Sequence, residues 1–267
     1  FHETFAVPLW PWQHILMRVW QYPQFVSLVR SGRSHFASTE RWLVQVRRWA
    51  RGPSCLLPVG SNLPLCELTK SEARKRLGIP SDALVLGVFG FAHITKRAEW
   101  IGAAARLVGS RFPQTQVLSV GQLGDSIRTA CGDVPLNDQG PLARPEVSLR
   151  LRAMDLFLAP LTDGISARRG SIVAALQHGL PICSTVREHT DRFLRDLASP
   201  GFSLTPYNRE ALFRESVLRM AERSLQEPDL GRDLVRFHDT HFAWQEIARR
   251  MVAGLLDANQ TQRSFTS

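Results

Sequence analysis

Apolar segments alternate along the chain with segments whose apolar residues recur at helical spacing. The segment Ala83–Phe91 (ALVLGVFGF) carries no polar side chain, which predicts a strand buried on both faces of a sheet. The segments Thr115–Val120 and Asp155–Pro160 are also mainly apolar and predict two more strands. Shorter strands are expected at residues 35–38, 54–59 and 181–184.

Turn and capping residues mark the ends of the helices between these strands. Gly78 and Gly179 follow two helices, as C-terminal glycines do, and Pro145 stands at the start of another. Thr95 and Asn208 are expected to cap helices at their N-terminal ends. Helices are predicted at residues 39–49, 71–77, 171–178, 208–225 and 241–256, with two more that begin near residues 95 and 145.

The alternation of strands and helices predicts an α/β fold. Repeated βαβ units build a doubly wound parallel sheet, a Rossmann-like domain, and we expect one complete domain over residues 81–205. Ligands of such domains bind at the carboxyl ends of the strands, where the winding changes direction. Three loops are therefore candidate binding loops: residues 91–96, 121–125 and 161–170.

The composition is that of a globular protein rich in arginine. The 267 residues are 44% hydrophobic and 21% charged, which predicts one or two folded domains. The net charge is +9, and only three of the 33 basic residues are lysines. Such a charge suits a nucleic acid, an anionic membrane or a phosphorylated ligand. No nucleic-acid partner is expected, because the arginines at residues 41–51 lack aromatic residues at base-stacking spacing.

The sequence indicates no metal and no bound cofactor. Its four cysteines show no paired spacing, and the eight histidines do not join them in a zinc-like pattern. His93, His178 and His189 are candidates for acid–base work, although an isolated histidine is usually structural. Glycine-rich nucleotide motifs and the nucleophile elbow are missing. We expect reduced thiols and a cytoplasmic protein.

Residues 4–29 form an aromatic stretch in which Arg18 is the only charged residue. Three prolines interrupt it, so no membrane-spanning helix is expected. Two interpretations stay open: a helix that makes a peripheral contact with the inner face of a membrane, or a helix buried against another domain. We favour the second. The chain begins at Phe1 without a basic segment before an apolar core, and no signal peptide is expected.

The first candidate site is the segment FGFAHITKR, residues 89–97. Gly90 and Phe91 end the buried strand, and Lys96 and Arg97 lie at the start of the next helix. Cations at a helix N-terminus oppose the helix dipole, so an anion such as a diphosphate is expected to offset them. The alternative is that both side chains are simply solvated.

The second candidate site is the segment DGISARRGS, between an apolar strand and a helix. It combines a turn, two arginines before the helix, a glycine that lets a ligand approach the backbone, and a serine that can donate or cap. The alternative is a capped helix with two surface arginines. The candidate diphosphate-binding residues here are Asp163, Gly164, Arg168, Arg169, Gly170 and Ser171.

In these segments the chain resembles the group-one (glycogen-synthase-like, retaining) glycosyltransferases of the GT-B fold. The similarity begins near residue 33 and rests on the order and spacing of several segments. FAWQEIARRM resembles the closing helix of that family. The segments are residues 71–91 with 95–99, residues 146–185 and residues 242–251.

The resemblance implies two Rossmann-like domains, of which the C-terminal one binds a nucleotide-sugar donor and the other an acceptor. It implies metal-independent transfer, in which basic side chains and helix amides stabilise the departing diphosphate. By motif position Lys96 corresponds to the diphosphate lysine, and Arg169 and Ser171 lie where helix amides meet the phosphates. Lys96 and Arg169 are the expected catalytic residues.

The chain departs from the family pattern at three positions. The family's Glu-x7-Glu pattern is replaced by Ser166 and Ala174, and Phe91 stands where an arginine commonly precedes the lysine by five residues. A DGxSxRRGS loop nevertheless resembles a variant found in one branch of the family. The candidates for compensation are Asp163, Arg97 and Arg168.

The resemblance also implies a domain division. Residues 1–60 are expected to be the end of an acceptor domain, residues 61–239 the donor-binding domain, and residues 240–267 a closing helix that packs back toward the acceptor domain, with a flexible tail. The chain is therefore expected to be the C-terminal part of a longer protein, and on its own to bind the donor weakly and transfer poorly.

The expected function is transfer of a sugar, a hexose in the main, from a nucleoside-diphosphate sugar to a glycan or lipid-linked acceptor. One alternative is a non-catalytic sugar-nucleotide-binding or scaffolding module. A second is a sugar-nucleotide epimerase of the same fold, which needs a pair of acid–base carboxylates that the sequence does not place.

Overall fold

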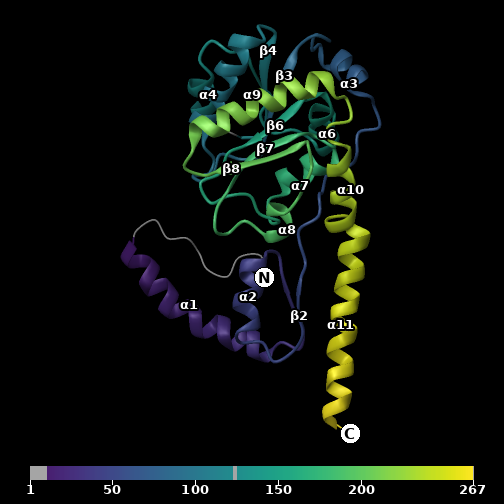
Figure 1. The fold of residues 1–267 in the computed structure, drawn as a ribbon. Helices are drawn as coiled ribbons and strands as arrows, with labels where there is room; N and C mark the ends of the chain where they lie inside the picture. The colour runs from purple at the N-terminus through teal and green to yellow at the C-terminus, as the bar shows by residue number, and fades with distance from the viewer. Residues whose placement is uncertain (1–10, 123–124, 267) are drawn as a thin grey trace. The chain divides into compact units, whose positions relative to one another are not determined.

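The computed structural model describes residues 11–122 and 125–266 of the chain. Contacts divide the chain into two units. One is Ser61–Thr240, and the other joins the chain up to Gly60 with the chain from His241 onward. Figure 1 shows the helices and strands of both.

The larger unit is built on a six-stranded parallel sheet with the order β5-β4-β3-β6-β7-β8. The doubly wound α/β fold predicted from the sequence is confirmed. The strands are β3 (Leu84–Phe89), β4 (Thr115–Val120), β5 (Leu136–Asp138), β6 (Leu156–Ala159), β7 (Ile182–Val186) and β8 (Phe202–Pro206).

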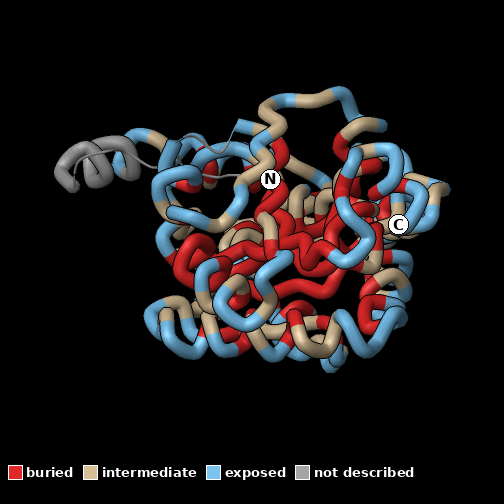
Figure 2. Tube along the Cα trace, turned by 90° about the horizontal axis from the view of Figure 1, so that it is seen from above, coloured by how far each residue is buried: buried red, intermediate tan, exposed pale blue. Residues whose placement is uncertain are grey.

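Helices cover the sheet, and its central strand β3 is buried at every residue from Leu84 to Val88. Helices α4 (Ala98–Arg111) and α9 (Glu210–Gln226) pack together, with the rings of Trp100 and Phe213 5.7 Å apart in the core. In Figure 2 the buried residues lie in the middle of the trace, with exposed residues around them. The other helices are α3 (Lys70–Leu77), α5 (Asp125–Cys131), α6 (Arg144–Ala153), α7 (Gly170–Gln177), α8 (Arg192–Arg195) and α10 (Arg232–His241).

A buried ion pair ties α3 to the sheet. The Asp155 carboxylate, before β6, accepts a hydrogen bond of 2.8 Å from the backbone amide of Val85 and pairs with Arg74. Lys70 lies 3.1 Å from its other oxygen. Arg74 also donates from Nε to the Ala153 carbonyl at 3.0 Å. Since both charges are partnered, this buried pair fixes how α3 packs.

The smaller unit contains a βαβ unit and two long helices. β1 (His35–Ala37) and β2 (Ser54–Leu56) pair in parallel, and α2 (Glu40–Arg47) connects them. Helix α1 (Pro11–Ser31) packs Phe25 and Val29 against Val46 of α2. Helix α11 (Trp244–Thr266) contacts β2, and Ser34 donates a hydrogen bond of 3.2 Å to the carbonyl of Gly254.

Several helix and strand predictions need correction. Thr95 does not cap α4, whose N-cap position is Arg97, and Asn208 does not cap α9, whose N-cap position is Arg209; neither position makes a side-chain capping hydrogen bond. The last predicted helix, 241–256, spans the end of α10 and the start of α11. Five elements were not predicted from the sequence: β5, β8, α5, α8 and most of α10.

The aromatic stretch at residues 4–29 forms helix α1 from Pro11 onward, with Pro23 inside the helix. Its first part, residues 4–10, lies outside the described residues. Among the helices that the structure describes, none combines the length and the apolar character needed to cross a bilayer.

Candidate anion-binding site

The strand order places a topological switch point between β3 and β6. These two strands are neighbours, with Leu86 paired to Leu156 and Gly87 to Phe157. From β3 the chain winds outward through β4 and β5, and from β6 it winds the other way through β7 and β8. Such a point opens a crevice at the carboxyl ends of the strands. Both candidate segments follow these two strands directly.

The loops that follow β3 and β6 are joined by backbone hydrogen bonds. The amide of Thr162 donates to the carbonyl of Thr95 at 2.7 Å, and the amide of Arg97 donates to that of Pro160 at 3.0 Å. Lys96 and Leu161 form an antiparallel bridge between these bonds. Both segments were expected at one edge of the sheet, and the structure brings them together there.

Lys96 lies at the base of this junction. Its Nζ donates to the carbonyl of Phe89 at 3.3 Å. A Cβ atom added at Gly90 would lie 3.6 Å from that Nζ and 3.9 Å from Cβ of Ser171, so these three residues adjoin. Burial, and next the positive charge of Arg169, lower the pKa of Lys96 to about 8. A lowered pKa means that the surroundings disfavour the charged form of Lys96, and an anion beside the ammonium group would stabilise that form.

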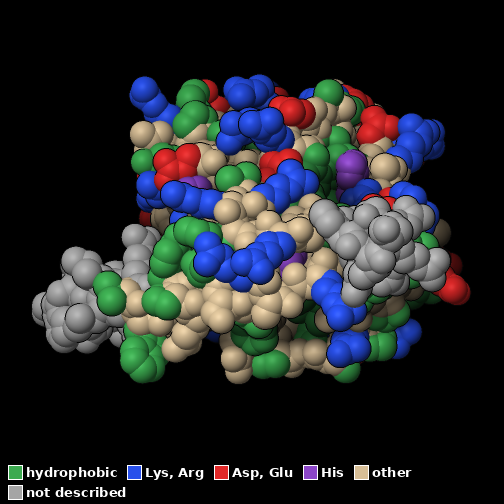
Figure 3. All heavy atoms as spheres, turned by 90° about the horizontal axis from the view of Figure 1, so that it is seen from below, with side chains coloured by type: hydrophobic (Ala, Val, Ile, Leu, Met, Phe, Trp, Pro, Cys, Tyr) green, Lys and Arg blue, Asp and Glu red, His purple; other side chains and the backbone are tan. Residues whose placement is uncertain are grey.

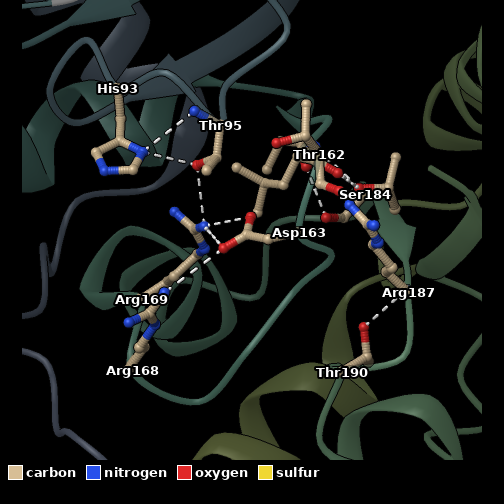
Figure 4. Close-up of polar contacts among 12 residues, drawn as sticks. His93, Thr95, Thr162, Asp163, Arg168, Arg169, Ser184, Arg187 and Thr190 are labelled. Atoms are coloured by element: carbon tan, nitrogen blue, oxygen red, sulfur yellow. Dashed lines mark hydrogen bonds and ion pairs between the residues drawn. The ribbon is translucent and has the colours of Figure 1, made fainter. Parts of the chain in front are cut away.

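The guanidinium of Arg169, from the loop after β6, points toward Asp163 and Thr95 (Figure 4). Its Nη2 lies 2.6 Å from both carboxylate oxygens of Asp163 and 3.1 Å from Oγ1 of Thr95. Arg168 lies 3.5 Å from the same carboxylate. The Asp163 carboxylate therefore faces two arginines.

The N-terminal end of α7 is open beside these cations. Arg169 occupies the N-cap position and makes no side-chain capping hydrogen bond. Gly170 is exposed, and a Cβ atom added to it would have no heavy atom within 4 Å. Since the first amides of a helix have no partner within the helix, this end favours an anionic ligand.

Arg97 differs from the other candidates. Its guanidinium lies over the ring of Trp100, 4.7 Å from the ring centroid, and 3.5 Å from Oε1 of Glu99. Its charge is thus partly balanced within the first turn of α4. Gly164 serves the turn after β6, where its φ of +78° and the crowding of an added Cβ require glycine.

A hollow of about 240 Å³ adjoins Lys96. From the sequence, Thr95 was expected to cap a helix and was not placed in a site. Its hydroxyl instead lies 2.8 Å from Nδ1 of His93, which lines the hollow. The hydrogen bond that Thr95 accepts from Arg169 could not be predicted from local sequence, because Arg169 lies in a loop far along the chain. The lining is Ala92, His93, Ile94, Lys96, Ala98, Ser126 and Ile127.

The positions that depart from the family pattern lie in different surroundings. Ser166 and Ala174 are both buried, and the Ser166 hydroxyl has no hydrogen-bond partner among the described residues. The side chain of Phe91 is exposed.

Within the described part of the chain, His, Cys, Asp and Glu form no group of three or more that could hold a metal. Figure 3 shows basic side chains spread over the face seen from below.

Comparison with known proteins places the fold. The chain matches no family model and no curated protein. It is similar over its whole length to sucrose-phosphate synthase from Thermosynechococcus elongatus, with a TM-score of 0.72 and 17% identity, and spans 67% of that chain. Over 95% of its length it is similar to Anabaena HepE, crystallised with UDP-glucose, with a TM-score of 0.69, 16% identity and 70% of that chain covered.

The chain has the GT-B glycosyltransferase fold. WaaG, a glycosyltransferase involved in lipopolysaccharide biosynthesis, shares it with a TM-score of 0.64 and 15% identity, over 83% of this chain and 62% of WaaG. The recognition of a GT-B fold from the sequence is confirmed. In this GT-B chain the Lys96–Arg169 cluster lies at the switch point of the six-stranded sheet.

Proposed function

We propose that this chain is the donor-binding part of a glycosyltransferase. The proposed reaction is the transfer of a sugar, specifically a hexose, from a nucleoside-diphosphate sugar to a glycan or lipid-linked acceptor. One observation carries the proposal: Lys96 and Arg169 lie in two loops that backbone hydrogen bonds join at the switch point, and together they form a cationic cluster. The Asp163 carboxylate balances part of this positive charge, and an anionic ligand at the switch point would balance the rest.

The chain's own residues supply the catalytic charge in this proposal. As the bond between sugar and diphosphate breaks, negative charge grows on the departing diphosphate. Nζ of Lys96, the guanidinium of Arg169 and the open end of α7 are placed to stabilise that charge. The nearby carboxylate, Asp163, already pairs with two arginines, which supports transfer without a metal. Retention of configuration is proposed from the resemblance alone.

The acceptor site belongs in this proposal to a second Rossmann-like domain. The chain spans 62% to 70% of the length of the three solved structures named above. The βαβ unit of β1, α2 and β2 is then the end of the acceptor domain, and α11, which contacts β2, is the closing helix.

A non-catalytic sugar-nucleotide-binding module is the second candidate. Ser166 and Ala174, at the positions of the family's two glutamates, supply no carboxylate and are buried. A chain without these carboxylates keeps the cationic cluster of Lys96 and Arg169, which would bind the phosphates, but it lacks the carboxylates that would contact the sugar hydroxyls. Both functions require nucleotide binding, and they differ in turnover.

Calorimetric titration of the chain with UDP and GDP tests the shared part of the proposal. We expect saturable binding of one of them, and no binding of either would overturn both functions. Release of nucleoside diphosphate from UDP-glucose, UDP-N-acetylglucosamine and GDP-mannose by the full-length gene product then separates the two. Release above a Lys96→Ala control indicates an enzyme, whereas binding without release indicates the module.

A further inference from the structure

Arg169 is held from two loops at once. Asp163 lies in its own loop and accepts Nη2 at 2.6 Å on both carboxylate oxygens. Thr95 lies in the loop before α4 and accepts the same Nη2 on its hydroxyl at 3.1 Å. Partners from two separate segments restrict the guanidinium far more than one partner does, because each removes rotamers that the other allows.

The turn after β6 fixes the backbone of Asp163. The amide of Gly164 donates to the carbonyl of Leu161 at 3.3 Å, and Gly164 has a φ of +78°. A Cβ atom at Gly164 would lie 2.5 Å from Oγ1 of Thr190 and 2.7 Å from the amide nitrogen of Arg187. The chain therefore passes here in a single conformation that only glycine adopts without strain.

Thr95 is fixed as firmly from its own side. Its carbonyl accepts the Thr162 amide at 2.7 Å, and its amide donates to Nδ1 of His93 at 3.2 Å. Since Nδ1 accepts that bond, it carries no proton. The Thr95 hydroxyl, 2.8 Å from Nδ1, must therefore be the donor in the second bond. The hydroxyl oxygen then presents its lone pairs to Arg169 (Figure 4).

This arrangement leaves part of the guanidinium for a ligand. Nη2 is engaged by Asp163 and Thr95, whereas Nε of Arg169 is buried and has no hydrogen-bond partner among the described residues. A buried donor without a partner costs free energy, which a ligand oxygen can recover. We propose that Thr95 and Asp163 are positioning residues that hold the Arg169 guanidinium beside Lys96, in the orientation that binds a diphosphate. The proposal rests on the function proposed above.

A double-mutant cycle with UDP as the probe tests the two positioning residues. Asp163→Asn and Thr95→Val are each made in the parent and in an Arg169→Ala background, and UDP affinity is measured by calorimetry. A carboxylate near a diphosphate repels it, so simple loss of that charge strengthens binding in either background. Loss of positioning weakens binding only where Arg169 is present. Asp163→Asn therefore has opposite expected signs under the two explanations.

We expect Asp163→Asn to weaken UDP binding about tenfold in the parent, and to leave it unchanged or strengthen it with Arg169→Ala. Thr95→Val is expected to weaken binding about threefold in the parent only, and Thr95→Ser to restore it. Arg111→Ala, at the far end of α4, controls for general loss of positive charge. Circular dichroism confirms folding of each variant.

Parental affinity in Thr95→Val, or stronger binding by Asp163→Asn in both backgrounds, would overturn the positioning role and leave the proposed function intact. Absence of UDP and GDP binding by the parent itself would mean instead that the proposed function fails. The Thr95 pair keeps the test decisive if Asp163→Asn does not fold.

Discussion

The backbone amide of Thr162 donates a hydrogen bond of 2.7 Å to the carbonyl oxygen of Thr95, and so fixes the loop after β6 against the loop before α4. Thr95 and Thr162 are 67 residues apart in the sequence. Because the two loops meet at the switch point, side chains from either loop reach the same small region.

UDP binding is expected to weaken as the pH rises through the pKa of Lys96. Burial and the charge of Arg169 lower that pKa to about 8, so the side chain is protonated at neutral pH and loses its charge within the accessible alkaline range. The protonated form attracts the diphosphate and the neutral form does not. Calorimetry from about pH 7 to 9.5 measures the effect.

Lys96→Met is the control for this pH dependence, since it keeps the length and loses the charge. Its UDP affinity should be low at pH 7 and nearly constant above it. Equal pH profiles for the parent and Lys96→Met would show that another group is responsible.

Gly170→Ala separates binding from stability. Gly170 begins α7, and an added Cβ meets no heavy atom within 4 Å. Alanine favours a helix, so the thermal midpoint should stay the same or rise. If a phosphate lies against the Gly170 amide, the added methyl group crowds it, and UDP affinity should fall about tenfold. Unchanged affinity would place the phosphate elsewhere.

Gly121→Ala is expected to be strongly destabilising. Gly121 has a φ of +103°, and an added Cβ would overlap the carbonyl oxygen of Gly90. Strain and overlap together should lower the free energy of unfolding by about 3 kcal/mol or more. Gly78→Ala is the matched control, because Gly78 has a φ of +67° but open space around it. It should cost only about 1 kcal/mol, and urea denaturation that finds equal costs would disprove the crowding at Gly121.

Arg74→Met should destabilise the larger unit by about 3–5 kcal/mol, because it leaves the buried Asp155 carboxylate without its main partner. Arg76 lies in the same helix with its side chain 65% exposed and 3.9 Å from Glu146. Arg76→Met should therefore change the free energy of unfolding by less than about 0.5 kcal/mol. Urea denaturation measures both, and a small effect of Arg74→Met would mean that α3 does not depend on this pair.

Local signals predicted much of the fold. The predicted strand at Thr115–Val120 has the same bounds as β4, because an apolar run and the turn residues beside it can be recognised within a short stretch of sequence. Gly78 takes the left-handed conformation at the end of α3, as a C-terminal glycine is expected to do. Strand β8 was missed because its sequence FSLTP is short, half polar and contains proline. Such a strand depends on pairing with β7, which the local pattern does not reveal.

The candidate site was predicted as two loops, and its internal contacts were not. Lys96 and Arg169 were named from their place at the start of a helix and from their positions in the motifs that resemble the family, and both signals are local in sequence. That Thr95 binds Arg169 instead of capping α4, and that Asp163 faces two arginines, depends on where the loops meet. Side-chain partners of this kind follow from tertiary structure, and helix signals alone predict the wrong partner for Thr95.

The affinity of UDP for the Lys96→Ala and Arg169→Ala variants is the most direct test of the shared anion site. Each side chain is proposed to contact the same diphosphate, so each variant should bind UDP at least about tenfold more weakly than the parent. Both variants should keep the parental thermal midpoint to within a few degrees. Parental UDP affinity in either variant would contradict the account, since that side chain would then lie outside the site.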